Sequence, residues 1–232
     1  MMQKDIISKN LEIIKNNIEK SCIKANRKIE DIEIIGVTKT IDIERIKILK
    51  ELGISTFGEN KAQELLEKYD NINDVSWHFI GNLQTNKVKY IIDKVKLIHS
   101  VNSLRLLEEI DKRALSNSIN MPILLEINIA NEQSKSGLLQ KDLEPILEYV
   151  KNFKNITLNG LMCVAPFVEN PKENAQYFRK MRKLFVDIAS KNKDNINMKY
   201  LSMGMTNDYG VAIEEGANII RIGTGIFGKR NY

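Results

Sequence analysis

Hydrophobic and polar positions follow two different patterns along the chain. Ile7, Leu11, Ile14, Ile18 and Cys22 recur at steps of three and four residues, which predicts one buried stripe on a long first helix. After this segment, short apolar and β-branched runs alternate with longer charged stretches of helical periodicity. This alternation predicts strands and helices in regular succession.

The alternation contains eight strand runs, and eight parallel strands are the number that closes a barrel. The predicted strands are Glu33 to Thr38, Ile54 to Phe57, Trp77 to Ile80, Leu97 to Val101, Ile123 to Ile129, Thr157 to Cys163, Lys199 to Met203 and Ile219 to Ile222. The predicted helices lie near residues 42–52, 61–70, 84–94, 103–118, 140–153, 172–191 and 207–215.

The predicted fold class is therefore α/β, a (β/α)8 TIM barrel with an extra N-terminal helix. The main alternative is an open doubly wound sheet, which would normally carry a glycine-rich phosphate loop after its first strand. The segment 37–41, Val-Thr-Lys-Thr-Ile, is not such a loop. Because no linker or shift in composition divides the sequence, we expect one domain over residues 1–232.

Composition and charge restrict the classes of partner. The 35 Lys and Arg residues and 30 Asp and Glu residues give a net charge of +5, but they are interspersed and form no long run of one sign. This pattern favours a mixed-charge surface over a nucleic-acid or membrane patch. The two cysteines share no metal-ligand spacing, and Cys163 lies in an apolar run typical of the core. Without a signal peptide or an apolar span, we expect a cytoplasmic protein.

The end of the first predicted strand carries the most informative side chain. In a barrel of this kind the strand ends and the loops that follow them form the active face. Lys39 comes directly after this strand, so its stem would lie against apolar walls at the barrel mouth. Desolvation there lowers the pKa of a lysine and makes its amine a nucleophile toward aldehydes. Taken alone, the pattern favours a solvent-facing lysine that merely ends a strand.

Small residues follow the last two predicted strands. Ser202 lies near the end of predicted strand seven, Thr206 follows that strand, and Gly223, Thr224 and Gly225 follow strand eight. Glycines let backbone amides approach an anion, hydroxyls add donors, and these two loops are the usual phosphate site of the fold. A tight turn or a helix N-cap at Thr206 would explain the same residues singly. Their placement on the same face as Lys39 predicts a site for a phosphorylated aldehyde.

Other polar strand ends have simpler interpretations. Asn60 closes strand two and could cap the next helix. His78 and His99 lie among apolar residues, which favours hydrogen-bonded interior histidines over catalytic bases. With these as the only histidines and no paired cysteines, we expect no metal site.

Several motifs in order resemble the pyridoxal phosphate homeostasis proteins of the YggS/PROSC type, over roughly residues 34 to 228. The matching segments are Gly36-Val37-Thr38-Lys39-Thr40, Phe57-Gly58-Glu59-Asn60 with Gln63-Glu64, Trp77-His78-Phe79-Ile80-Gly81 with Leu83-Gln84 and Asn86-Lys87, Ile98-His99-Ser100-Val101, Glu132 through Lys135-Ser136-Gly137, Gly160-Leu161-Met162, Ser202-Met203-Gly204-Met205 and Arg221-Ile222-Gly223-Thr224. Two departures are Thr38, where many relatives have serine, and Ile41, where another sequence is usual.

The resemblance implies a monomeric barrel of the alanine-racemase N-terminal type that binds pyridoxal 5′-phosphate. It implies that Lys39 forms the Schiff base and that Arg221 faces the pyridine nitrogen. The remaining implied cofactor-binding residues are Ser202, Gly223 and Thr224 at the phosphate, with Asn60 and Met203 as further pocket members.

Little or no catalysis is expected of such a site. An arginine is a permanent cation and should keep the pyridine ring neutral, which weakens it as an electron sink. Alanine racemases use a tyrosine from a second domain as one base, and this sequence ends at Tyr232, so we expect no such domain. We therefore expect a carrier that maintains cofactor homeostasis and delivers it to apo-enzymes. The alternatives are an amino-acid racemase or related enzyme, and a barrel for another phosphorylated metabolite.

Overall fold

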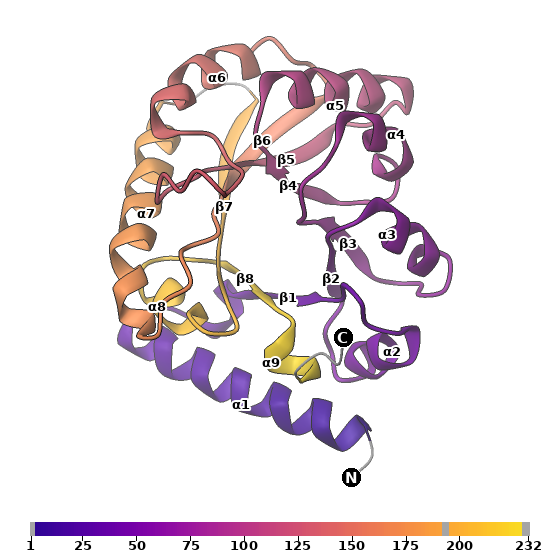
Figure 1. The fold of residues 1–232 in the computed structure, drawn as a ribbon, viewed down its shortest axis with the longest axis vertical. Coiled ribbons are helices and arrows are strands. Elements are labelled where there is room, and N and C mark those ends of the chain that lie inside the picture. Colours follow the sequence, from indigo (N-terminus) through magenta and orange to yellow (C-terminus); the bar gives the residue numbers. More distant parts are fainter. Residues whose placement is uncertain (1–2, 192–194, 229–232) are drawn as a thin grey trace.

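Eight parallel strands close into a barrel in the order β1-β2-β3-β4-β5-β6-β7-β8 (Figure 1). The structure is a computed structural model, and it describes residues 3–191 and 195–228. The strands are β1 (Glu33–Val37), β2 (Thr56–Glu59), β3 (Ser76–Phe79), β4 (Leu97–Val101), β5 (Met121–Glu126), β6 (Ile156–Met162), β7 (Ile196–Met205) and β8 (Ile219–Ile222). The fold class predicted from the alternating pattern is confirmed.

Helices surround the barrel and connect its strands. They are α1 (Gln3–Lys24), α2 (Ile43–Glu51), α3 (Ala62–Tyr69), α4 (Val88–Ile91), α5 (Leu104–Ser116), α6 (Leu143–Val150), α7 (Ala175–Ala189), α8 (Tyr209–Glu214) and α9 (Thr224–Phe227). Short 3-10 turns are η1 (Ile29–Asp31), η2 (Thr85–Lys87), η3 (Gln140–Asp142) and η4 (Pro171–Asn174). Within the described ranges, no helix combines the length and apolar character needed to cross a membrane.

Two apolar clusters divide the core. The side chains of Ile35, Leu97, Leu124, Met162 and Ile219 come from five different strands and form a small cluster in the barrel interior. A larger cluster lies between the outer faces of the strands and the helices, as expected when every strand of a parallel sheet is buried on both faces.

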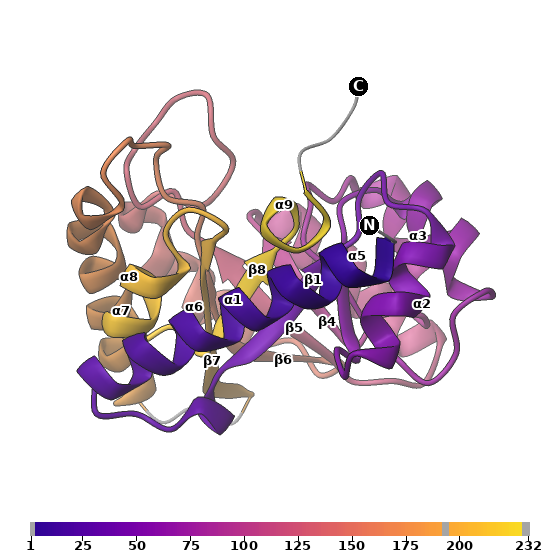
Figure 2. The ribbon, with the colours of Figure 1, turned by 90° about the horizontal axis from the view of Figure 1, so that it is seen from below.

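The first helix packs against elements from the other end of the sequence. Its predicted stripe, from Ile7 to Cys22, is buried. α1 lies along the outside of the barrel beside α8, α9 and α2 (Figures 1 and 2). The Asn10 side chain donates a 2.9 Å hydrogen bond to the carbonyl of Ile226, and Asn17 donates to the hydroxyl of Tyr209 at 3.2 Å. The predicted extra helix is thus an integral part of the shell.

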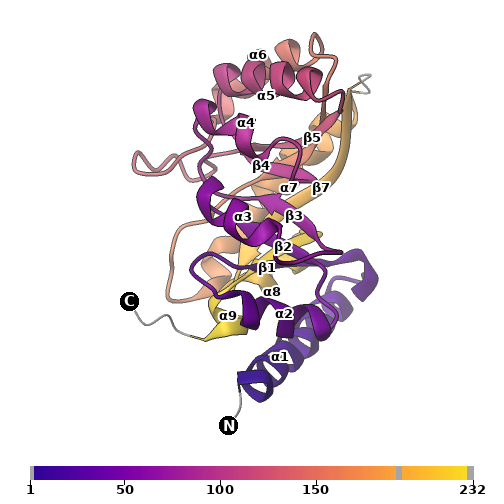
Figure 3. The ribbon, with the colours of Figure 1, turned by 90° about the vertical axis from the view of Figure 1, so that its right-hand side faces the viewer.

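Some predicted boundaries are wrong for physical reasons. The strand predicted at 54–57 is β2 at Thr56–Glu59, because Glu59 is fully buried with Lys68 as its ion-pair partner and does not mark a surface turn. The helix predicted at 84–94 is reduced to η2 and the short α4. β4 and β8 have the predicted bounds. The connections after β5 and β6 project furthest from the barrel, on the side of α9 (Figures 2 and 3).

Candidate functional site

A cavity of about 880 Å³ lies at the carboxyl ends of the strands. Its lining residues are Val37, Lys39, Asn60, Ile80, Glu132, Lys135, Val164, Ala165, Pro166, Phe167, Val168, Pro171, Asn174, Met205, Thr206, Asn207, Asp208, Arg221, Gly223 and Thr224. These come from the ends of, or connections after, every strand except β4. This volume is typical of sites for small organic ligands.

The cavity brings together most of the residues predicted to bind a cofactor. Lys39, Asn60, Arg221, Gly223 and Thr224 all line it, although they come from three regions far apart in the sequence. Lys39 follows β1 and is half-buried. The predicted convergence of a strand-one lysine with the loop after strand eight is therefore present.

Ser202 and Met203 lie deeper, in β7, and neither is among the lining residues. Both are fully buried. The Ser202 hydroxyl contacts Arg221 and His99, at 2.7 Å and 3.0 Å. Its side chain is therefore engaged inside the barrel, and a role for either residue at the phosphate stays a prediction.

Arg221 is the cation at the floor of the cavity. It is only 4% exposed, and its guanidinium donates to the hydroxyl of Ser202 at 2.7 Å and to the carbonyl of Cys163 at 2.8 Å. Burial lowers the pKa of Arg221 from its ordinary value, with Cys163 and Asp208 opposing that effect. A guanidinium starts so far above neutrality that it remains protonated in proteins. Arg221 therefore supplies a fixed positive charge with an imposed orientation.

Two histidines continue this hydrogen-bonded chain into the barrel. His99 Nδ1 lies 3.0 Å from Ser202 Oγ, and His99 Nε2 lies 3.1 Å from His78 Nδ1. Arg221 can only donate to Ser202, so the Ser202 hydroxyl donates its proton to His99 Nδ1. The neutral His99 ring then carries its own proton on Nε2, which donates to His78 Nδ1. Burial lowers the pKa of His78 to about 4, and burial together with His78 and Arg221 holds the pKa of His99 well below its usual range.

Both histidines are consequently neutral near pH 7, and the interpretation of them as hydrogen-bonded interior residues is confirmed. Cys163 is also buried as predicted, and burial raises the pKa of its thiol to about 12. The chain His78–His99–Ser202–Arg221 gives the guanidinium a rigid support from below. This support fixes the position of the guanidinium relative to a ligand bound in the cavity.

The loops after β7 and β8 are tied together by Thr206. Its hydroxyl accepts a 3.1 Å hydrogen bond from the backbone N–H of Gly225. A Cβ atom at Gly225 would come within 3.1 Å of the Thr206 and Ile222 side chains, so glycine leaves room for the close approach. The N-cap interpretation of Thr206 is wrong, because the N-cap of α8 is Asp208. Thr206 is a cavity residue whose turn context concealed it in the sequence.

These observations fit a phosphorylated pyridine aldehyde. Lys39 and Arg221 both line the cavity, so an amine would be available to the aldehyde and a fixed cation to the ring. Thr206, Gly223 and Thr224 gather at one wall, where hydroxyls and closely approaching backbone suit a phosphate. The cavity's carboxylates have partners of their own, since Asp208 binds Asn174 at 2.8 Å and Glu132 pairs with Lys135 at 2.8 Å.

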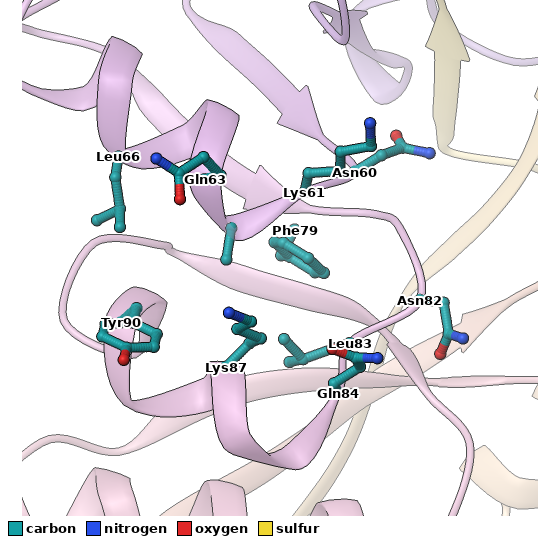
Figure 4. Close-up of a pocket in the computed structure, with 11 residues that line it drawn as sticks. Asn60, Lys61, Gln63, Leu66, Phe79, Asn82, Leu83, Gln84, Lys87 and Tyr90 are labelled. Atoms are coloured by element: carbon teal, nitrogen blue, oxygen red, sulfur yellow. The ribbon is translucent and has the colours of Figure 1, made fainter.

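A second cavity of about 520 Å³ adjoins the first and shares Asn60 with it (Figure 4). It lies between α3 and the segment η2–α4. Gln63 and Tyr90 lie on one side of it, and Asn60 and Asn82 lie on the other. The N-cap of α3 is Lys61, so the helix-capping alternative for Asn60 is wrong. Asn60 instead forms part of the wall of both cavities.

Comparison with known sequences gives a consistent result. The sequence model for "Alanine racemase, N-terminal domain" matches residues 10–231. A pyridoxal phosphate homeostasis protein of Aquifex aeolicus is 42% identical over 224 residues, which cover 96% of this chain and 97% of that protein. The protein of the same name from Haemophilus influenzae is 33% identical and covers 97% of each chain.

Solved structures agree in fold. PipY of Synechococcus elongatus, with PLP bound, is 27% identical and superimposes with a TM-score of 0.83, over 96% of this chain and 100% of that one. An alanine racemase of Clostridium difficile, at 18% identity and a TM-score of 0.74, shares the fold. This chain matches 58% of that racemase's length.

Proposed function

This chain belongs to the pyridoxal phosphate homeostasis family, whose barrel is the alanine racemase N-terminal domain, and from that premise we propose that it binds pyridoxal 5′-phosphate and serves as a carrier. The observation that carries the proposal is the convergence of Lys39, Arg221, Gly223 and Thr224 on one cavity. The PLP-bound state of PipY supports it independently.

Each group in the cavity has a defined role in this proposal. Lys39 would hold the cofactor through its amine, which can condense with the aldehyde to give C=N in place of C=O with release of water. Thr206, Gly223 and Thr224 bind the phosphate through hydroxyl and backbone donors. Arg221 faces the pyridine nitrogen. When bound, the cofactor supplies an electron sink for carbanions, and this sink is strongest when the ring nitrogen is protonated.

A carrier role follows from the charge on Arg221. A guanidinium held beside the ring nitrogen disfavours protonation of that nitrogen, so the sink is weak. The buried chain Ser202–His99–His78 keeps the guanidinium in place. A reversible covalent bond with little onward chemistry suits storage and delivery, with apo-enzymes that need the cofactor as recipients.

An absorbance spectrum and a trapping experiment test the covalent bond. The purified protein mixed with pyridoxal 5′-phosphate should gain a visible absorption band, and borohydride reduction should leave a pyridoxyl group on Lys39 in peptide mass spectra. Lys39→Ala should abolish both signals. Lys61→Ala is the matched control, because Lys61 is exposed and lines the second cavity, not the cavity that contains Lys39. An adduct on another lysine, or none, would contradict the proposal.

A racemase assay separates the carrier from the enzymatic alternative. Purified protein loaded with cofactor is incubated with single enantiomers of common amino acids, and inversion is followed by chiral chromatography. Turnover above ~1 s⁻¹, which is ordinary for enzymes, would refute the carrier role.

A further inference from the structure

The backbone on both sides of Lys39 is held by side chains that lie outside the cofactor cavity. The Thr38 carbonyl accepts from Lys68 Nζ at 2.8 Å, and the Thr38 hydroxyl donates to Glu59 Oε1 at 2.5 Å. On the other side, the Thr40 N–H donates to Glu64 Oε2 at 2.7 Å. Lys39 is thus the central residue of a tripeptide that is fixed at both ends.

The charged groups that hold it are connected to each other. Lys68 Nζ lies 2.7 Å from Glu59 Oε1 and 3.4 Å from Glu64 Oε2. The Lys68 side chain is 8% exposed and that of Glu59 is fully buried. We call Glu59, Glu64 and Lys68, with the two threonines, the Lys68 network. Replacing a buried ion pair by apolar residues is often neutral or stabilising, so stability alone does not account for this one.

Thr40 adds an observation from the backbone. Its φ is 63°, in the left-handed region that a β-branched residue rarely adopts. Such a conformation persists only where the surrounding structure enforces it, and such residues cluster at functional sites. Here two contacts hold it: the Ile41 N–H donates to the Thr38 carbonyl at 2.9 Å, which closes a turn over Lys39 and Thr40, and the Glu64 carboxylate accepts from the Thr40 N–H, directly beside Lys39.

The geometry points to Glu59, Glu64 and Lys68 as positioning residues for Lys39, an inference that rests on the proposed function. They restrict the main chain from which the Lys39 side chain projects into the cavity. Less backbone freedom is then lost when the amine condenses with the aldehyde, with formation of C=N and release of water. Preorganisation of this kind raises affinity by reducing the entropy lost on binding. The network therefore acts on the covalent step, and the phosphate and ring contacts do not depend on it.

This distinction defines the experiment. Apparent dissociation constants are measured for pyridoxal 5′-phosphate and for pyridoxine 5′-phosphate, which has an alcohol in place of the aldehyde and forms no Schiff base. Glu64→Ala should reduce the ratio of the two affinities by about tenfold, while affinity for the alcohol stays unchanged. Glu64→Gln should retain most of the ratio, because a carboxamide oxygen can still accept from the Thr40 N–H.

Glu67→Ala provides the control on the same helix. This substitution removes an equal charge from α3. The Glu67 side chain contacts Gln63 and not residues 38–40. The inference would be overturned if Glu64→Ala and Glu67→Ala had the same affinity ratio. It would also be overturned if Glu64→Ala lost the same factor of affinity for both ligands. If Glu64→Ala does not fold, the nearly isosteric Thr38→Val, which removes the bond to Glu59, is measured in the same way.

The wild-type protein separates this inference from the proposed function. No preference for the aldehyde and no pyridoxyl group on Lys39 would refute the proposed function, and the positioning role with it. A clear preference in the wild type that persists in Glu64→Ala and Thr38→Val would refute the positioning role alone.

Discussion

Two buried serines allow a test of the hydrogen-bonded chain beneath the cavity. Ser202→Ala removes the acceptor of the Arg221 guanidinium and the donor to His99, with almost no change in volume. Ser100→Ala makes the same chemical change at the same depth, because both residues are at most 1% exposed. Ser100 Oγ, however, has no hydrogen-bond partner within the described part of the chain. The pair therefore isolates the chain's contribution from the general effect of deleting a buried hydroxyl.

The magnitudes follow from these contacts. Loss of a hydrogen bond to a charged group, with a buried histidine nitrogen left unsatisfied, should lower the free energy of unfolding by about 2 kcal/mol. Ser100→Ala removes a polar atom that is buried without a partner, so it should raise the free energy of unfolding by about 1 kcal/mol. The two variants should therefore differ by roughly 3 kcal/mol.

Urea unfolding of the cofactor-free protein measures this difference. The midpoints should move in opposite directions with unchanged m-values, because neither substitution alters the surface exposed on unfolding. The reasoning is refuted if the two variants agree within about 0.5 kcal/mol, a difference typical of substitutions without a specific contact.

Three further predictions concern acid stability, the first helix and the ligand. The His78 pKa of about 4 lies below its usual 6.5, so between these pH values the unfolded chain binds a proton that the native state does not. The free energy of unfolding should therefore fall by roughly 3 kcal/mol as the pH falls through this window. In pH-dependent urea melts, His78→Gln should abolish that part of the decrease. Leu11→Ala should lower the free energy of unfolding by about 3 kcal/mol. Ile13→Ala, at a half-exposed position of the same helix, should change it by less than about 0.5 kcal/mol. Equal effects of the two substitutions would contradict the packing of α1. Pyridoxal 5′-phosphate at about 100 times its dissociation constant should add about 2.7 kcal/mol and raise Tm by several degrees in a thermal scan, and no shift would exclude the site.

The sequence predicted the barrel because hydrophobic periodicity is a local signal that each element carries by itself. β4 and β8 have the predicted bounds because each begins and ends on an apolar residue. β2 was misplaced because Glu59 is neutralised by Lys68, nine residues away, and a pairing of this kind leaves no local pattern. The N-cap interpretation of Thr206 failed for a similar reason, because its partner Gly225 lies nineteen residues further on.

The candidate site shows the same division. Lys39 was found from its position at the end of the first strand, where the topology dictates the outcome, whereas Arg221 was implied only by the family resemblance. The resemblance implied Ser202 at the phosphate, and this stays a prediction; in the structure Ser202 lies within β7, where its hydroxyl accepts from Arg221 and lies 3.0 Å from His99 Nδ1. Which face of a strand a residue occupies depends on register, and register was not available from the pattern alone.

The packing of α1 has a consequence for how the chain acquires its structure. Asn10 bonds to Ile226 across 216 residues, and α1 packs on α8 and α9. During synthesis, this amphipathic helix emerges long before the surface that covers its apolar stripe exists. Until then the stripe is open to chaperones and to other nascent chains, so the seam between α1 and α9 should be among the last parts of the molecule to become protected from hydrogen exchange during refolding.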